Sequence, residues 1–348
     1  MSMEKGCLVM SGGGCHVRTG RSSIRKYGTA FGVVSMAALV LAACGSSSSK
    51  TVSAAKPSKS ITVGVTILST QEPWYATVEE GMKKEASALG VKIIVTNSNS
   101  SVVTESNNIR DLISDKVSVI AVTPVNSSSS VPAVQAASSA GIPVITWNNT
   151  LDSNIPKAFV GINNLAYGEA AGQQAVPYIK KYMGGKANIG TLLLPGYPTV
   201  NARTTGFLKE VDALPGVHLV AEGTFNGTPS SAYTGIRNIL TAHPNINLIF
   251  APAEGATDAV NSALSATNSH AVVVGLDLDA VGEREVLAKN SPLKILVTQN
   301  PYRIGIETIE TAVKVARHEA VPSNVLVPFN VINASNIKAY VAKWPIPD

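Results

Sequence analysis

The chain has 348 residues, 45% of them hydrophobic, and a formal net charge of +5. Five basic residues and one acidic residue lie within the first 43 positions, so the remainder carries a net charge of only about +1. This balance argues against a nucleic-acid-binding surface, and the roughly 300 residues that follow favour two lobes over one small core.

The N-terminal segment has the pattern of an export signal. Residues 29–43 are almost wholly apolar and follow a basic flank, and the run is too short to span a membrane comfortably. It ends at Leu41-Ala42-Ala43-Cys44-Gly45, which resembles the bacterial lipoprotein box. The resemblance implies a lipoprotein signal peptide over residues 1–43, cleavage before Cys44 and acylation of that cysteine. A plain signal peptide and a short buried helix are the alternatives.

Cys44 is the one cysteine left after such a cleavage, because Cys7 and Cys15 lie in the signal peptide. This excludes an intramolecular disulfide and a cysteine-based metal site in the mature chain. Residues 44–60 are rich in Ser and Lys and lack apolar periodicity, which predicts a flexible tether. We expect the lipid to hold the protein on the extracytoplasmic face of the cell membrane, in the periplasm if the envelope is Gram-negative.

From residue 61 onward, short β-branched runs alternate with helical patterns. Strands are predicted at 61–68, 91–96, 117–123, 142–147, 187–194, 217–224, 248–251, 271–276, 293–298 and 325–329. Helices are predicted between them at 73–89, 102–114, 131–140, 165–182, 200–214, 232–242, 257–266, 281–289 and 304–317. Apolar strands separated by helices predict an α/β fold with two doubly wound lobes, each with a parallel sheet. A ligand is then expected outside the carboxyl ends of the strands.

Segments at these strand ends and nearby carry a family resemblance. In chain order they are Glu72-Pro73-Trp74-Tyr75, 141–149 (GIPVITWNN), 203–207 (RTTGF), 240–244 (LTAHP), 274–277 (VGLD) and 298–305 (TQNPYRIG). From about residue 61 to 328, the chain resembles the ribose/galactose-type substrate-binding proteins of ABC importers, which share their fold with LacI-type regulators. The resemblance implies a ligand cleft between the lobes and a hinge of three crossing segments near residues 162, 299 and 330. The lobes would comprise 61–162 plus 300–329 and 163–299 plus 330–348.

The resemblance also implies ligand-binding roles for individual residues. Trp74 and Tyr75 match a pair of aromatic residues that pack against a sugar ring. Arg203 matches an arginine that donates to ligand hydroxyls, while Asp277 accepts from them and Gln299 does both. The alternatives are a core position for Trp74, a solvated helix charge for Arg203 and a helix N-cap for Asp277.

The chain departs from the family pattern at several of these positions. Asn148 and Asn149 stand where sugar-binding members usually have Asp-Arg, and Ala253-Glu254 stand where Asn-Asp is usual. Glu72 occupies a position where an amide is common, and it offers an acceptor for a hydroxyl or an amine. Its alternative role is a first-turn helix acid. These departures argue against ribose as the ligand. Phe225 is a further candidate for stacking on the ligand.

Motifs for catalysis are not found in the sequence. The five histidines are scattered, and no phosphate loop, nucleophile elbow or metal-ligand spacing occurs, so no enzyme activity, metal or cofactor is expected.

We expect a monomeric, lipid-anchored receptor that captures a small sugar or polyol by hinge closure and delivers it to the permease of an ABC importer. The alternatives are a ligand-sensing module for a chemoreceptor or histidine kinase, and a binder of an autoinducer-2-like furanose. A LacI-type regulator is disfavoured because a leader and tether replace the helix-turn-helix, and no nucleic-acid partner is expected.

Overall fold

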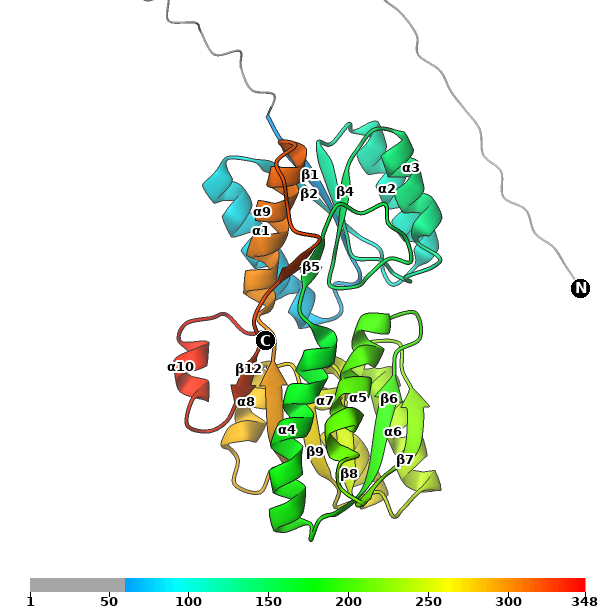
Figure 1. The fold of residues 1–348 in the computed structure, drawn as a ribbon, viewed down its shortest axis with the longest axis vertical. Coiled ribbons are helices and arrows are strands. Elements are labelled where there is room, and N and C mark those ends of the chain that lie inside the picture. Colours follow the sequence, from blue (N-terminus) through cyan, green and yellow to red (C-terminus); the bar gives the residue numbers. More distant parts are fainter. Residues whose placement is uncertain (1–59, 348) are drawn as a thin grey trace, which may run out of the picture. The chain divides into compact units, whose positions relative to one another are not determined.

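The computed structural model describes residues 60–347, which lie in one compact unit (Figure 1). Residues 1–43 and the lipidation site Cys44 lie outside the described residues, as does all but the end of the tether. The described residues form two six-stranded sheets with helices on both faces, and the predicted fold class is confirmed. No helix among these residues is long and apolar enough to cross a membrane.

The first sheet is parallel throughout. Its order is β11 (Asn324–Leu326), β5 (Phe159–Gly161), β4 (Val144–Trp147), β3 (Val119–Val122), β1 (Thr62–Ile67) and β2 (Lys92–Asn97). Four helices cover it: α1 (Pro73–Leu89), α2 (Val102–Ser114), α3 (Val131–Ser139) and α9 (Pro301–Ala316). We call this sheet and its helices the first lobe. Its central strands are almost fully buried, as expected for a sheet covered on both sides.

The second sheet is parallel except at one edge. Its order is β12 (Asn330–Ile332), β10 (Leu293–Thr298), β9 (Val272–Leu276), β8 (Leu248–Ala251), β6 (Lys186–Leu193) and β7 (Gly216–Thr224), with β12 antiparallel to β10. With it pack α4 (Asn164–Tyr182), α5 (Pro198–Val211), α6 (Pro229–Ala242), α7 (Glu254–Thr267) and α8 (Ala280–Leu287). We call this group the second lobe. A short helix, α10 (Ile337–Val341), follows β12.

The chain passes between the two sheets three times. The passages lie between β5 and α4, between β10 and α9, and between β11 and β12 (Figure 1). Consequently the carboxyl ends of β1 and β4 in the first lobe and of β9 and β10 in the second lobe supply loops to one region. The sequence patterns did not predict β5, β12 or α10, since each has only three to five residues.

Helices α4 and α5 pack in backbone contact. A Cβ atom added to Gly168 would lie 1.9 Å from the carbonyl oxygen of Arg203, and one added to Gly206 would lie 2.1 Å from the α4 backbone. Only glycine permits an approach this close. These two glycines therefore fix the distance between the helices, and with it the position of Arg203 on α5.

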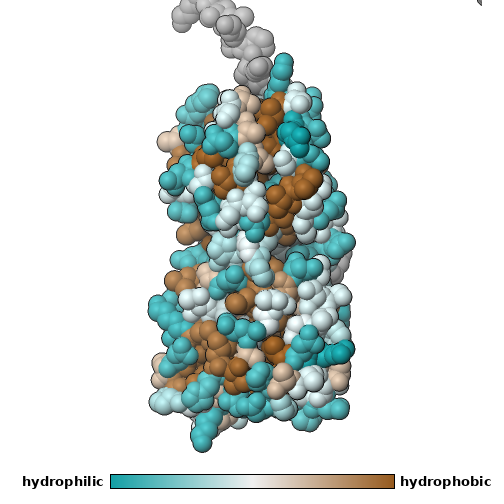
Figure 2. All heavy atoms as spheres, turned by 90° about the vertical axis from the view of Figure 1, so that its right-hand side faces the viewer, coloured by the Kyte–Doolittle hydropathy of each residue, from teal (hydrophilic) through white to brown (hydrophobic). Residues whose placement is uncertain are grey.

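The surface does not carry a continuous apolar belt on the face in Figure 2. Hydrophobic side chains gather there in separate patches on both lobes, among hydrophilic ones. Large exposed apolar side chains among the described residues are dispersed over several elements; they are Val103, Leu165, Tyr182, Leu219, Leu287 and Leu326. Scattered exposed apolar residues are normal for a globular surface.

Candidate ligand-binding site

A small cavity lies where loops from both lobes meet. Its lining combines aromatic, aliphatic, acidic and amide side chains with one arginine: Leu68, Glu72, Trp74, Tyr75, Asn148, Leu194, Tyr197, Val200, Arg203, Gly227, Ala253, Glu254, Asp277 and Gln299. Eight of the nine ligand residues expected from the sequence are in this group. The volume of the cavity is only ≈ 50 Å³, below the range of pockets that hold a small-molecule ligand. The lobes must therefore move apart to admit a sugar-sized ligand.

The first lobe contributes an aromatic wall. The rings of Trp74 and Tyr75, at the start of α1, are 5.0 Å apart in an edge-to-face arrangement. Trp147, the last residue of β4, stacks behind Trp74 at 6.4 Å with the two planes 10° apart. Asn148 donates from Nδ2 to the Tyr75 hydroxyl at 3.0 Å. Buried aromatic neighbours thus hold Trp74 and Tyr75 in fixed orientations. The sequence had not identified Trp147 as a support for them.

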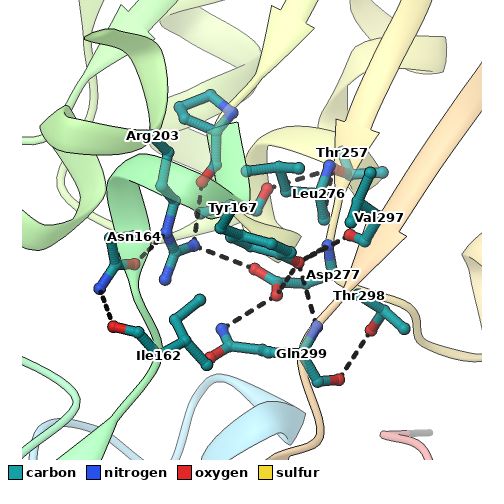
Figure 3. Close-up of polar contacts among 12 residues, drawn as sticks. Ile162, Asn164, Tyr167, Arg203, Thr257, Leu276, Asp277, Val297, Thr298 and Gln299 are labelled. Carbon is teal, nitrogen blue, oxygen red and sulfur yellow. Dashed lines mark hydrogen bonds and ion pairs between the residues drawn. The ribbon is translucent and has the colours of Figure 1, made fainter. Parts of the chain in front are cut away.

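The second lobe contributes a buried ion pair. Arg203 Nη1 lies 3.2 Å from Asp277 Oδ2, and both side chains are only 4% exposed. The same Nη1 donates to the carbonyl oxygen of Pro252 at 3.0 Å, and Nε donates to Asn164 Oδ1 at 2.8 Å. Gln299 donates from Nε2 to Asp277 Oδ1 at 2.9 Å (Figure 3). Such a charge-assisted network fixes the fork of the arginine before any ligand arrives.

Tyr167, on α4, holds the ends of β9 and β10 together. Its hydroxyl oxygen lies 2.6 Å from the Val297 carbonyl oxygen and 2.9 Å from Asp277 Oδ1, which share its one proton as acceptors, and it accepts from the backbone N–H groups of Asp277 and Gln299 at 3.1 Å each (Figure 3). Sequence reasoning missed this residue and Asn164. Their spacing of three residues at the start of a helix places both on one face, but it does not indicate what that face contacts.

Two site residues have left-handed backbone conformations. Asn148 has a φ of 61° and Asp277 a φ of 67°. Residues other than glycine adopt this conformation rarely and at a cost, although asparagine and aspartate tolerate it best. Both follow directly after strands, β4 and β9, on opposite sides of the cavity. Strained residues of this kind cluster where side chains must be aimed at a ligand.

Three buried polar atoms have no hydrogen-bond partner and belong to side chains that line the cavity. They are Trp74 Nε1, the Tyr197 hydroxyl oxygen and Glu254 Oε2. Leaving a polar group buried without a partner costs about 1–3 kcal/mol. The three atoms come from both lobes and offer a donor, a donor-acceptor and an acceptor to whatever enters the cavity. The sequence had not singled out Tyr197.

Two cavity carboxyl groups have raised pKa values. Burial raises the pKa of Glu72 to about 7, and the nearby carboxylate of Asp277 adds to the effect. Burial also raises the pKa of Glu254 well above its usual range, with Asp277, Asp258, Asp279 and Glu72 contributing through charge repulsion. Glu72 is the N-cap residue of α1, but its side chain makes no capping hydrogen bond. Neither carboxyl is engaged by the arginine.

Asn149 does not line the cavity. Its Nδ2 donates to the carbonyl oxygens of Pro124 at 3.1 Å and Gly196 at 3.4 Å, and its Oδ1 accepts from the Thr199 hydroxyl at 3.1 Å. The residue is fully buried and joins the first lobe to a loop of the second. Its direct contact with ligand remains a prediction, and its hydrogen bonds favour a role in holding the lobes together.

Phe225 lines a neighbouring groove of ≈ 500 Å³ instead of the cavity. The groove and the cavity share Leu68, Leu194 and Tyr197. Phe225 is therefore placed to contact a ligand only beyond these three side chains. Among residues 60–347, no group of three or more His, Cys, Asp or Glu side chains is arranged to hold a metal ion.

Known proteins share both the sequence pattern and the fold. The ribose import binding protein of Bacillus subtilis is 27% identical over 289 residues, which cover 80% of this chain and 90% of that protein. A solved ABC transporter solute-binding protein from Mycobacterium smegmatis with bound glycerol matches with a TM-score of 0.76 and 26% identity, over 83% of this chain and all of the other. Another solute-binding protein, from Actinobacillus succinogenes with bound D-allose, matches with a TM-score of 0.72 and 26% identity, over 80% of this chain and all of the other. A family model for the periplasmic binding protein domain matches residues 63–320, and the chain therefore belongs to the periplasmic binding protein family.

Proposed function

We propose that this protein captures a small sugar or polyol between its two lobes and delivers it to the permease of an ABC importer. The observation that carries the proposal is that three residues around one cavity between the lobes, Trp74, Tyr197 and Glu254, each have a buried polar atom without a hydrogen-bond partner. A hydroxylated ligand supplies partners to all three. The relatives described above, which bind ribose, glycerol and D-allose by their names, support the same ligand class. The family is one of substrate-binding proteins, which are not enzymes.

In this proposal the protein exists in an open and a closed arrangement of the lobes, and ligand binding favours the closed one. Trp74 and Asn148 face the ligand from the first lobe, and Arg203 and Asp277 face it from the second, so only the closed arrangement makes both sets of contacts. The ligand then stabilises the closed population by its differential contacts. Apolar ring faces lie against Trp74, while hydroxyl groups meet the preformed arginine–carboxylate pair. An isomer that leaves one polar group unpaired is penalised, which is the source of selectivity.

Inter-lobe hydrogen bonds complete the closed form. The backbone N–H of Ser127 donates to the Gly196 carbonyl at 3.2 Å, and Asn149 contacts both Gly196 and Thr199. Gly196 has a φ of 83°, and a Cβ atom there would lie 2.2 Å from Asn126 Nδ2. Glycine is therefore favoured by the backbone conformation, and a side chain at this position would displace the amide of Asn126.

A ligand screen on the protein from residue 60 onward tests the function. Pentoses, hexoses, alditols and cyclitols are added singly and the unfolding temperature is recorded. A true ligand at 100 times its dissociation constant stabilises the folded state by about 2.7 kcal/mol, a shift of several degrees. The Trp74→Ala variant, which lacks the aromatic wall, serves as the control and should show a much smaller shift. If no carbohydrate or polyol raises the unfolding temperature, the proposal is wrong.

We also propose that a lipid on Cys44 anchors the receptor to the membrane. The lipoprotein-box sequence before Cys44 and the Ser-rich segment after it support this. In cells that express the whole chain, the protein should fractionate with membranes, and mass spectrometry of its N-terminal peptide should find acylated Cys44. The Cys44→Ser variant should lose both properties. A wild-type N-terminus that begins elsewhere without lipid contradicts the anchor but leaves the ligand proposal intact.

A further inference from the structure

The charges that face the cavity are out of balance. Glu72 enters from the first lobe, Glu254 and Asp277 enter from the second, and Arg203 is the one cationic residue in the lining. Arg203 is paired with Asp277 at 3.2 Å. Two carboxyl groups, one from each lobe, are thus left facing the cavity without a cation.

Glu72 and Glu254 flank the same backbone segment. A Cβ atom added to Gly227 would lie 3.1 Å from Glu72 Oε1, while one added to Gly255, next to Glu254, would lie 2.5 Å from the Gly227 carbonyl oxygen. Gly227 has a φ of 98°. The absence of a side chain at Gly227 keeps the space beside Glu72 open. Glu72, from the first lobe, and Gly255, the neighbour of Glu254 in the second lobe, therefore both lie against Gly227.

Among the described residues, neither carboxyl makes a hydrogen bond or ion pair that accounts for its position, although Glu254 lies in the first turn of α7, where an acid is favoured. Glu254 is 5% exposed and its Oε2 atom has no hydrogen-bond partner, and the side chain of Glu72 does not cap its helix. Arg203 makes its hydrogen bonds to Asn164, Pro252 and Asp277 and none to either glutamate. Burying a carboxylate without a partner is costly, and a cation placed between the two would remove that cost. The raised pKa values of both groups are the expected signature of this missing charge.

We propose that the natural ligand is an amine-bearing sugar or polyol, whose ammonium group lies between Glu72 and Glu254 while its hydroxyl groups contact Arg203, Asp277 and Gln299. This inference rests on the proposed function and names the ligand class more closely. A neutral polyol leaves both carboxyl groups without a counter-charge. An ammonium group donates to both at once, and it favours closure because it joins acidic groups of opposite lobes.

Matched pairs of ligands test the inference by isothermal titration calorimetry at pH 7.0. The pairs differ only in an amine replacing a hydroxyl: D-glucosamine and D-glucose, D-galactosamine and D-galactose, 1-amino-1-deoxy-D-sorbitol and D-sorbitol, and serinol and glycerol. In at least one pair, the amine should bind about tenfold tighter or more, which is the effect of one charge-assisted hydrogen bond. If a neutral partner binds and its amine is no better in any pair, the amine inference is overturned and the sugar or polyol function stands. If neither member of any pair binds, the amine inference is overturned, and the wider carbohydrate screen decides the sugar or polyol function.

Charge-removing variants locate the ammonium group. Glu72→Gln and Glu254→Gln keep the side-chain shape, and each should lower the affinity ratio of the preferred amine to its hydroxyl partner about tenfold or more. Glu80→Gln, at an exposed position on the same helix as Glu72, is the matched control and should leave this ratio unchanged. Equal losses for the amine and its partner would mean that the two glutamates serve only the structure of the cavity, which overturns the inference.

The pH dependence of affinity gives an independent reading. Between pH 5.5 and 7.5, affinity for the amine should rise as Glu72 ionises, since its pKa is about 7 and protons compete with the ammonium group. The charged or titratable groups that face Glu72 are Tyr75, Tyr197, Arg203, Glu254 and Asp277, and burial keeps the pKa values of both tyrosines well above this range. Affinity for the neutral partner should stay level or fall over the same interval. If affinity for the amine falls over this interval while affinity for the neutral partner rises, the result contradicts an ammonium contact at Glu72.

Discussion

Arg203→Ala is expected to abolish ligand capture and to lower the free energy of unfolding by about 3–5 kcal/mol, the usual cost of removing one partner of a buried ion pair. The change leaves Asp277 buried and 4% exposed without its cation. It also removes the donors to the Pro252 carbonyl and to Asn164. Affinity should fall at least about a hundredfold, because the guanidinium group supplies more than one charge-assisted hydrogen bond, each with a net effect of about 1.5–3 kcal/mol.

Urea unfolding and calorimetry on the same preparations separate the two effects. Arg303→Ala is the matched control, because Arg303 forms an i,i+4 pair with Glu307 at 2.5 Å and its side chain is 41% exposed. Exposed pairs of this kind contribute about 0–1 kcal/mol, so this variant should retain both stability and affinity. Asp277→Ala combined with Arg203→Ala should recover part of the lost stability but none of the affinity. An Arg203→Ala protein that binds ligand normally would contradict the assignment of the site.

Local signals in the sequence account for the agreement between predicted and observed helices. The helix predicted at 73–89 occurs at those residues because Pro73 fits a first turn and Gly90 ends the helix with a φ of 65°. The helix at 102–114 also matches, and the side chain of Ser101 caps it by accepting from Thr104. The ends of these helices depend on residues within one turn of the terminus, so they can be recognised in a single sequence. The three-residue strands β5 and β12 lack such signals and exist only because a neighbouring strand pairs with them.

Some residues of the candidate site could likewise be predicted from local rules, and others could not. Residues directly after strands, such as Asn148 and Asp277, follow from the rule that ligands lie at the carboxyl ends of parallel strands. Tyr167 could not be found by that rule, because its hydroxyl meets Asp277 across 110 positions of sequence and Gln299 across 132. The helix pattern also identifies it only as a buried residue. Likewise, Asn149 fits the rule but points into an inter-lobe network, since the rule fixes where a residue lies and not which way its side chain turns.

The free energy of unfolding of the ligand-free protein is expected to fall as pH rises from about 4.5 to about 7. Burial raises the pKa of Glu72 from 4.5 to about 7, so in this interval the folded protein binds a proton that the unfolded chain has released. Stability therefore decreases with pH wherever the folded state holds more protons. The loss from Glu72 is complete once the pH has passed its folded-state pKa. Below pH 4.5 both states are protonated at this group and its contribution is level.

Asp258 extends the decline to higher pH. Burial and the neighbouring carboxylate of Asp279 raise its pKa to about 8, and its Oδ1 atom has no hydrogen-bond partner. Glu254, one helical turn before Asp258 on α7, also has a raised pKa. The folded protein should therefore continue to lose stability from pH 7 to about pH 8, as the last of Glu72 and then Asp258 ionise.

Unfolding profiles from pH 4.5 to 8 for the wild type, Glu72→Gln and Glu80→Gln measure this dependence. Glu72→Gln should be more stable than the wild type near pH 7 and should have a flatter profile up to that pH, since a neutral amide cannot ionise in the cavity. Glu80→Gln should follow the wild type, because Glu80 is exposed. A wild-type profile that rises through this interval contradicts the expectation.

A saturating amine ligand should cancel the slope up to pH 7, because the ammonium group stabilises the ionised form of Glu72 in the folded state alone. A neutral sugar should raise the whole curve and leave its slope unchanged.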